Sequence, residues 1–189
     1  VYTFCMCPGG YVVAAASEEG GVVTNGMSYA DRAGENANAA LLVTLNPQVF
    51  PYPGALGGMY WQREIEQRAY ALSGSYCAPA QRIATGQKTN YHSVGVDVEG
   101  RPLPAGITDA LEKAIAALDG NLKGFADPDG VLTAPETRSS SPVRICRDET
   151  RQSGVRGLYP TGEGAGYAGG IMSAAIDGIQ TAEAILEQL

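Results

Sequence analysis

The residues best suited to chemistry are glycines near the C-terminal end of the sequence. Five of them fall within nine residues, 162–170, just before apolar positions that repeat at helical spacing. A glycine in a helix costs about 0.5–1 kcal/mol relative to alanine, and close approach of a ligand or of another backbone segment usually offsets that cost. Because a helix N-terminus presents unpaired N–H groups and partial positive charge, this loop could bind an anionic or polarised oxygen.

Three ligand sites fit a glycine loop to different degrees. A nucleotide P-loop is excluded, because Ile171 and Met172 follow Gly170 where Lys and Ser/Thr are needed. Residues 164–169 match G-x-G-x-x-G, but a dinucleotide fingerprint also needs a second strand ending in an acidic residue, and only a helical segment follows. The third is the closing strand, loop and helix of a flavoprotein. A packing turn without any ligand remains the alternative.

Cysteines give a weaker signal. Cys5 and Cys7 are two residues apart, so in a strand both side chains would point to one face and could form a redox disulfide or part of a metal site. The sequence has four cysteines and one histidine, and no second ligand pair such as C-x-x-C. We therefore expect no metal site and interpret the cysteines as reduced thiols of a cytoplasmic protein.

Composition limits the classes of partner. The chain has 189 residues, with 20 Asp and Glu against 13 Lys and Arg and no basic block. This balance argues against nucleic acid and against an anionic membrane surface. No run of eighteen apolar residues exists, so we expect no membrane-spanning segment. The length is enough for one ordinary domain or two small ones. Because the sequence starts with strand-like residues and no initiator Met, we interpret it as a fragment.

Hydrophobic patterns and turn residues predict alternating strands and helices. A loop rich in proline and glycine at 47–57 is a candidate boundary, and 77–103 has no clear pattern. In the last helix we expect Met172, Ile176 and Ile179 on a packed apolar face. Asp177 and Thr181 would be solvated. Strands are expected near residues 1–4, 11–14, 21–24, 41–45, 131–136, 143–146 and 157–161, and helices over 61–72, 104–118 and from the glycine loop to the end.

Several segments together resemble a known family, the uncharacterised FAD-dependent dehydrogenases, which are related to two-domain flavoprotein oxidoreductases. The first match is F-C-M-C-P-G-G at 4–10, running on to V-T-N-G-M-S-Y at 23–29. The second is E-T-R-S-S-S-P-V-R-I at 136–145, and the third and most specific is G-L-Y-P-T-G-E-G-A-G-Y-A-G-G-I at 157–171. A fainter likeness covers 78–82. The N-terminal half of such proteins, with its phosphate-binding glycines, is missing from this sequence.

The resemblance implies a role for each of these segments. Gly162 and Glu163 would lie along the ribityl and pyrophosphate part of FAD, and the loop from Gly166 to Ile171 would bring a helix N-terminus to the pyrimidine edge of the flavin. The full cofactor-binding set is Gly162, Glu163, Gly164, Ala165, Gly166, Gly169, Gly170 and Ile171.

Candidates for the substrate side, opposite the flavin, are Asn25, Met27 and Arg138. A salt bridge or loop anchor is the alternative for Arg138, and a core position is the alternative for Met27. The substrate itself is a small molecule that the sequence does not identify, and no catalytic residue is assigned.

The expected fold is α/β with an α+β insertion. Residues 1–46 and 142–189 would form the C-terminal part of a three-layer FAD-binding domain, with its closing strand and C-terminal helix. Residues 47–141 would form an inserted substrate-side or cap module. We predict that the chain is the C-terminal fragment of an FAD-dependent oxidoreductase and that it supplies the flavin-side glycine loop and the substrate-side module. NAD(P) is a candidate electron donor.

The fragment by itself is expected to hold no FAD and to be inactive. Its partner would be the missing N-terminal half of the FAD domain, or a second copy in a homodimer that covers its open strand edges. A binding or scaffold module that keeps the fold without the cofactor is the alternative.

Overall fold

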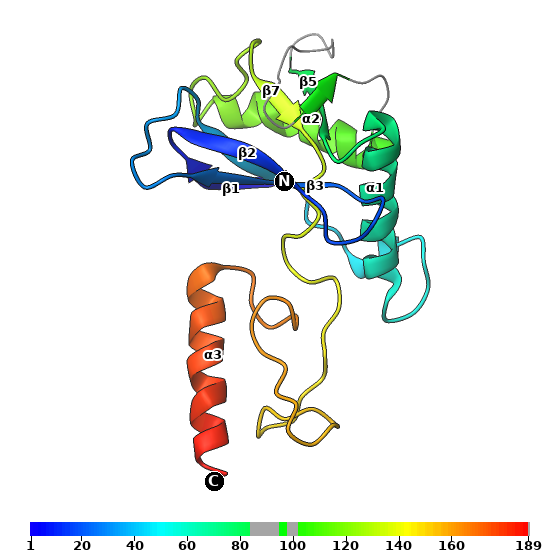
Figure 1. Cartoon of the computed structure of the whole chain (residues 1–189), viewed down its shortest axis with the longest axis vertical. Helices are drawn as coiled ribbons and strands as arrows, with labels where there is room; N and C mark the ends of the chain where they lie inside the picture. Colours follow the sequence, from blue (N-terminus) through cyan, green and yellow to red (C-terminus); the bar gives the residue numbers. More distant parts are fainter. Residues whose placement is uncertain (84–94, 98–101, 189) are drawn as a thin grey trace. The chain divides into compact units, whose positions relative to one another are not determined.

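The computed structural model describes residues 1–83, 95–97 and 102–188, and its elements alternate between short strands and three helices (Figure 1). The chain divides into two compact units, residues 1–46 with 62–137 and residues 47–61 with 138–189. The strands are β1 (Tyr2–Cys7), β2 (Gly10–Ala15), β3 (Val23–Ser28), β4 (Asn38–Leu42), β5 (Ala78–Arg82), β6 (Gly95–Asp97) and β7 (Val131–Thr133). The helices are the 3-10 turn η1 (Pro47–Val49), α1 (Gly57–Ser73), α2 (Ala105–Asp119) and α3 (Ile171–Leu186).

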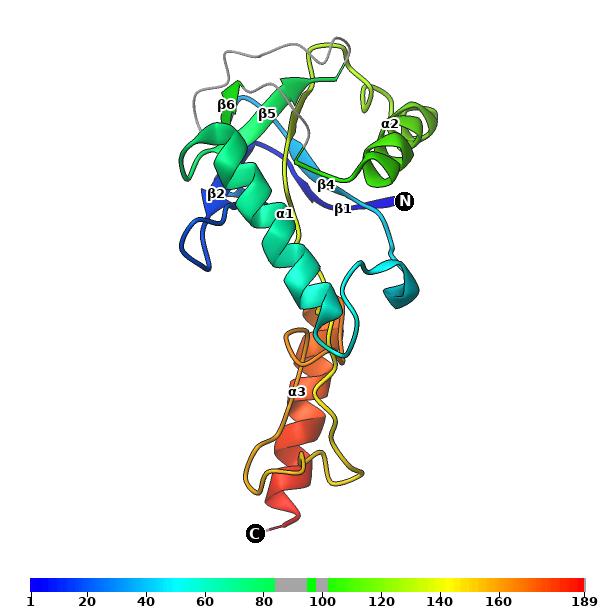
Figure 2. The same ribbon diagram turned by 90° about the vertical axis from the view of Figure 1, so that its right-hand side faces the viewer.

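The first unit contains three small sheets. β2 and β3 form an antiparallel hairpin in register from Gly10 opposite Ser28 to Ala15 opposite Val23. β1 pairs antiparallel with β4, and the pairing is interrupted by a bulge between Phe4 and Cys7. The third sheet has the order β6-β5-β7, parallel on one side of β5 and antiparallel on the other. β5 and β7 lie side by side in Figure 1, and β5 and β6 lie side by side in Figure 2.

The core of the first unit is small and includes one buried acid. Its buried apolar side chains are Val22, Val23, Ile65, Ala69, Ala78, Ala80 and Ile115. Glu66 on α1 is only 2% exposed; its carboxylate accepts a hydrogen bond from the Thr137 hydroxyl at 2.6 Å, and its carbonyl accepts one from the Val22 N–H. The N–H and hydroxyl of Thr24 both donate to the Pro135 carbonyl, at 2.7 and 3.0 Å. These bonds fix the segment after β7 against the hairpin and α1.

Most predicted elements of the first unit are confirmed. The strands expected at 1–4 and 11–14 are β1 and β2, and the helices expected at 61–72 and 104–118 are α1 and α2. Three strands differ in their bounds from the expected ranges 21–24, 41–45 and 131–136. β3 starts later, at Val23, β4 ends earlier, at Leu42, and β7 ends earlier, at Thr133. Pro135 follows two residues after β7, and a proline has no N–H with which to continue a ladder.

Two predicted strands are wrong, the ones at 143–146 and 157–161. Neither segment pairs with a strand among the described residues; their backbone groups bond locally instead. The Ile145 N–H donates to the Ala165 carbonyl, and the Leu158 N–H donates to the Val155 carbonyl. The Pro160 carbonyl is taken by the Arg147 guanidinium at 2.8 Å, and Pro160 has no N–H to offer. The closing strand of the expected flavin domain is therefore an irregular segment.

The fold class is confirmed in its coarser form: the chain is a mixture of α-helices and small sheets. Within 1–83, 95–97 and 102–188 no three-layer FAD-binding arrangement is present. The compact units also divide the chain at other residues than the expected domains 1–46 with 142–189 and 47–141. Those domain boundaries stay a prediction.

Candidate functional site

The glycine loop, residues 162–170, leads directly into α3 in the second unit. It folds as successive turns, in which the Gly166 N–H donates to the Glu163 carbonyl and the Tyr167 N–H to the Gly162 carbonyl. The Glu163 carboxylate accepts the Ser140 N–H at 2.8 Å. The loop is thus held by its own chain, and the side chain proposed to line FAD already has one internal bond.

Gly166 is required by a close approach of the protein's own backbone. Its φ is +84°, a left-handed conformation that side chains disfavour. A Cβ at this position would lie 2.5 Å from the Val143 carbonyl oxygen and 2.9 Å from the Arg144 Cα. The Gly166 carbonyl also accepts the Arg144 Nε–H at 3.0 Å. Of the two causes considered for costly glycines, backbone packing explains this one.

Gly170 is different, because no contact among the described residues requires a glycine there. Its backbone is extended, with φ −171°, and a Cβ would meet only the Ser173 hydroxyl, at 3.8 Å. Gly170 is the N-cap of α3 and makes no side-chain capping bond. Among the described residues, the N–H groups of Ile171, Met172 and Ser173 have no acceptor. This helix start therefore presents open donors, the arrangement that suits an anionic or polarised oxygen.

A buried carboxylate holds the loop and the helix together. Asp177 on α3 is 8% exposed and accepts bonds from both guanidinium nitrogens of Arg147, at 2.6 and 3.0 Å, and from Arg151 at 2.7 Å. The Gly162 N–H donates to the same carboxylate at 2.9 Å. Hydrogen bonds from Arg147, then from Gly162 and Arg151, hold the pKa of Asp177 far below its usual range although burial opposes this.

Tyr167 in the loop is fixed by the same arginine. The Arg147 guanidinium lies 3.6 Å from the centre of the Tyr167 ring, and the Tyr167 hydroxyl donates to the Ile145 carbonyl at 3.1 Å. The hydrogen bond to Asp177 raises the pKa of Arg147 against the effect of burial. Both charges of this pair are used internally, so we assign these residues to positioning rather than to chemistry.

The face of α3 that packs is the opposite of the one expected. Asp177 and Thr181, expected in solvent, are 8% and 5% exposed, and the Thr161 hydroxyl bonds to that of Thr181 at 3.0 Å. The apolar residues that were expected to pack are exposed to solvent. The apolar side chains of α3 that are at least half exposed are Ile171, Met172, Ile176, Ile179 and Leu186. The expectation was wrong because one buried ion pair outweighs the apolar stripe in setting the orientation of this helix.

The substrate-side candidates fall in both units. Asn25 and Met27 are in β3, opposite Val13 and Tyr11 of β2. Asn25 is exposed and Met27 is half buried. Arg138, which is exposed, starts the long segment of the second unit. The grouping of these three residues against a flavin stays a prediction.

The residues missed by sequence reasoning are Arg147, Arg151 and Tyr167. One available signal was the pair of arginines four residues apart, followed in the last helix by an aspartate within an apolar run. Among the described residues, no group of three or more His, Cys, Asp or Glu could hold a metal ion. Cys7 is not part of a disulfide, and the side chain of Cys5 lies outside the described residues. Of the helices described, none is both long and apolar enough to cross a membrane.

Comparisons with known proteins place the chain in a wider context. A family model described as "FAD-dependent protein, C-terminal domain-like" matches residues 1–139, which contain all the sheets but not the glycine loop. An uncharacterized protein of Clostridium beijerinckii (strain ATCC 51743 / NCIMB 8052) is 48% identical over 202 residues. The match includes 100% of this chain and 38% of that relative. The chain thus spans well under half the length of the relative.

Gly166→Ala should destabilise the second unit, because the new Cβ meets backbone atoms and the left-handed conformation disfavours alanine. We expect a loss of about 2 kcal/mol in the free energy of unfolding. Gly154→Ala is the matched control, since a Cβ there has nothing within 4 Å and its φ is not positive. Urea unfolding followed by circular dichroism measures both. Equal stability of the two variants would contradict the close approach.

Asp177→Asn should destabilise the chain by about 3–5 kcal/mol, since it leaves two arginines with an uncompensated buried charge. Because the pKa of Asp177 is depressed on folding, its contribution is present above the unfolded pKa of about 3.9 and is lost as pH falls below that value. The wild-type chain should therefore lose more stability below pH about 4 than the variant. Hydrogen exchange at the Gly162 amide reports the same bond locally. Unchanged exchange in Asp177→Asn would refute this role.

Proposed function

Since the chain belongs to the family of C-terminal domains of FAD-dependent proteins, we propose that it is the C-terminal part of a longer flavoprotein oxidoreductase. The observation that carries the proposal is the family match over residues 1–139, together with a relative of which this chain covers only 38%. FAD would supply electron transfer to or from a small molecule. This chain would supply a flavin-facing helix start and the substrate-side module, with NAD(P) a candidate electron donor.

The start of α3 is the part of this chain best suited to contact FAD. Its open N–H groups at Ile171, Met172 and Ser173 have the polarity that the electron-rich pyrimidine edge of a flavin requires. Gly170, which has no side chain, would let the ligand approach closely, and no contact among the described residues otherwise accounts for a glycine there. Glu163, Gly164, Ala165 and Gly169 complete the proposed contact with the cofactor. Gly162 and Gly166 would act on the loop's shape rather than on FAD.

The element that provides most of the affinity for FAD would lie outside this chain. Most of the affinity of a dinucleotide site comes from a strand, glycine turn and helix that hold the pyrophosphate. Such an element is not found among the described residues. A few hydrogen bonds from the α3 start, each worth about 0.5–1.5 kcal/mol, are far below the roughly 8 kcal/mol of micromolar binding. We therefore propose that FAD binds only when the rest of the longer protein is present.

The exposed apolar face of α3 supports the same interpretation. Ile171 is 86% exposed and Met172 is 72% exposed, with Ile176, Ile179 and Leu186 further along the helix. Burying such side chains contributes about 1.5–3 kcal/mol each. We propose that polypeptide of the longer protein covers this face. A homodimer of the chain would cover it in the absence of that polypeptide.

The alternative is a module that keeps the fold without FAD. The observation in its favour is that the chain itself explains Gly162, through its left-handed φ of +75°, and Gly166, through the close approach of the Val143 carbonyl. The two proposals differ in what they explain. Contact with FAD would explain Gly170 and the open N–H groups that follow it, and the scaffold alternative explains neither. Purifying the longer protein separates them first. A colourless protein, without flavin absorbance, would refute the FAD proposal itself.

In the longer protein, Gly170→Val should lower flavin occupancy with little effect on melting temperature. The branched side chain would obstruct approach to the helix start, while its Cβ would meet only the Ser173 hydroxyl, in ordinary contact at 3.8 Å, among the described residues. Losing one or two hydrogen bonds should weaken FAD binding about five- to tenfold. The ratio of flavin to protein absorbance measures occupancy after dialysis. Gly154→Val is the control, and a Gly170→Val protein with full flavin would show that the helix start makes no contact with FAD.

A further inference from the structure

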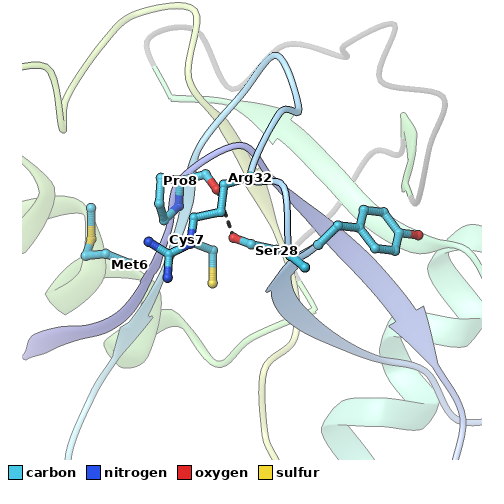
Figure 3. Close-up of a pocket in the computed structure, with 7 residues that line it drawn as sticks. Met6, Cys7, Pro8, Ser28 and Arg32 are labelled. Carbon is cyan, nitrogen blue, oxygen red and sulfur yellow. Dashed lines mark hydrogen bonds between the residues drawn. The ribbon is translucent and has the colours of Figure 1, made fainter.

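A pocket at the ends of β1 and β3 is the strongest remaining candidate for a binding site. It has a volume of about 590 Å³ and is lined by Met6, Cys7, Pro8, Ser28, Tyr29, Ala30 and Arg32. This volume is within the usual range of about 300–1,000 Å³ for small-molecule sites. Figure 3 shows Met6, Cys7 and Pro8 from the end of β1 next to Arg32, with Ser28 from the end of β3 beside them. None of these residues belongs to the glycine loop.

Arg32 is the only charged residue in the lining. Among the residues that the structure describes, its guanidinium has neither an ion pair nor a hydrogen bond. No carboxylate lines the pocket. The nearest acid in sequence, Asp31, has a carboxylate oxygen 3.4 Å from the Ala33 N–H. The pocket is thus locally positive in a chain of net charge −7.

The backbone holds Arg32 in place at a cost. Its φ is +51°, a left-handed conformation that non-glycine residues seldom adopt because it is strained. The Arg32 N–H donates to the Tyr29 carbonyl at 3.1 Å. Gly9, at φ +55°, allows the two loops to touch, because a Cβ there would lie 1.9 Å from the Arg32 carbonyl oxygen. Ser28 fixes the other wall by donating from its hydroxyl to the Pro8 carbonyl at 2.9 Å.

We propose that this pocket binds a small organic carboxylate, with the anion at Arg32 and an apolar body against Met6 and Pro8. A guanidinium is suited to a carboxylate because its paired N–H groups match two oxygens. The thioether and the proline ring provide the apolar wall, and Met6 is 56% exposed. A metal ion does not fit, since no acidic side chain lines the pocket. The inference does not depend on the flavin proposal, since it uses only the first unit.

The thiol of Cys7 can serve as a probe of the pocket, because Cys7 lines the pocket and is not in a disulfide. Iodoacetate and iodoacetamide transfer similar groups to a thiol with loss of iodide, and only the first carries a carboxylate. The ratio of their rates at Cys7, followed by peptide mass spectrometry, measures attraction of the anion. Cys77 and Cys146 provide internal references, since both are exposed thiols.

We expect Arg32→Gln to lower the iodoacetate-to-iodoacetamide ratio at Cys7 about two- to fivefold, as for loss of an exposed charge pair. The ratio at Cys77 and Cys146 should not change. Arg32→Lys should restore most of the effect, and Arg82→Gln is the control, because Arg82 is paired with Asp129 elsewhere in the unit. A ratio at Cys7 that is the same with and without Arg32 would overturn the proposal.

The apolar part of the proposal needs a second measurement. Benzoate should slow the reaction of Cys7 with iodoacetamide, whereas benzamide, which has the same ring and no charge, should slow it less. Acetate, which has the charge and no ring, should also be weaker. Equal protection by benzamide and benzoate, or protection by neither, would refute binding of a carboxylate with an apolar body. Loss of benzoate protection in Arg32→Gln would assign the anion to Arg32.

Discussion

The second unit depends on one buried carboxylate. Asp177 receives two arginines and the Gly162 N–H, and through them it joins the irregular segment, the glycine loop and α3. Taking a carboxylate out of water costs several kcal/mol unless opposite charges and hydrogen bonds replace the solvent. Four hydrogen bonds meet that requirement here. Because they can form only if Asp177 faces inward, they also decide how α3 is oriented.

The orientation of α3 has two consequences for function. Its apolar stripe, with Ile171 and Met172 at the start, is left outside instead of contributing to a core. Its N-terminal donors also remain open, because the loop before it is bonded to Asp177 and to Arg144 rather than folded over the helix end. A helix with an exposed apolar face and an uncapped start suits a surface that other parts of a longer protein complete. The family match and the partial coverage of the relative support the same view.

Local patterns predicted the first unit well and the second poorly. The helices α1 and α2 and the strands β1 and β2 follow from periodicity, since nearby residues determine them. The segment 157–161 has strand-like residues, yet its carbonyls are bonded by Arg147 and by its own turns, and pairing of this kind is not encoded by periodicity. The inward position of Asp177 likewise depends on arginines about thirty residues away. For the glycine loop, the sequence indicated close approach correctly, but only the structure separates Gly166, explained by backbone, from Gly170, which is not.

We propose that this chain contributes to an FAD site but lacks the element that provides most of the affinity for FAD. Titration of FAD into the purified 189-residue chain, followed by calorimetry or flavin fluorescence, measures this affinity. We expect no binding up to high micromolar concentrations, because the open donors of α3 provide only a small part of the roughly 8 kcal/mol that micromolar affinity requires. A dissociation constant at or below about ten micromolar would contradict it and would place the cofactor grip within this chain.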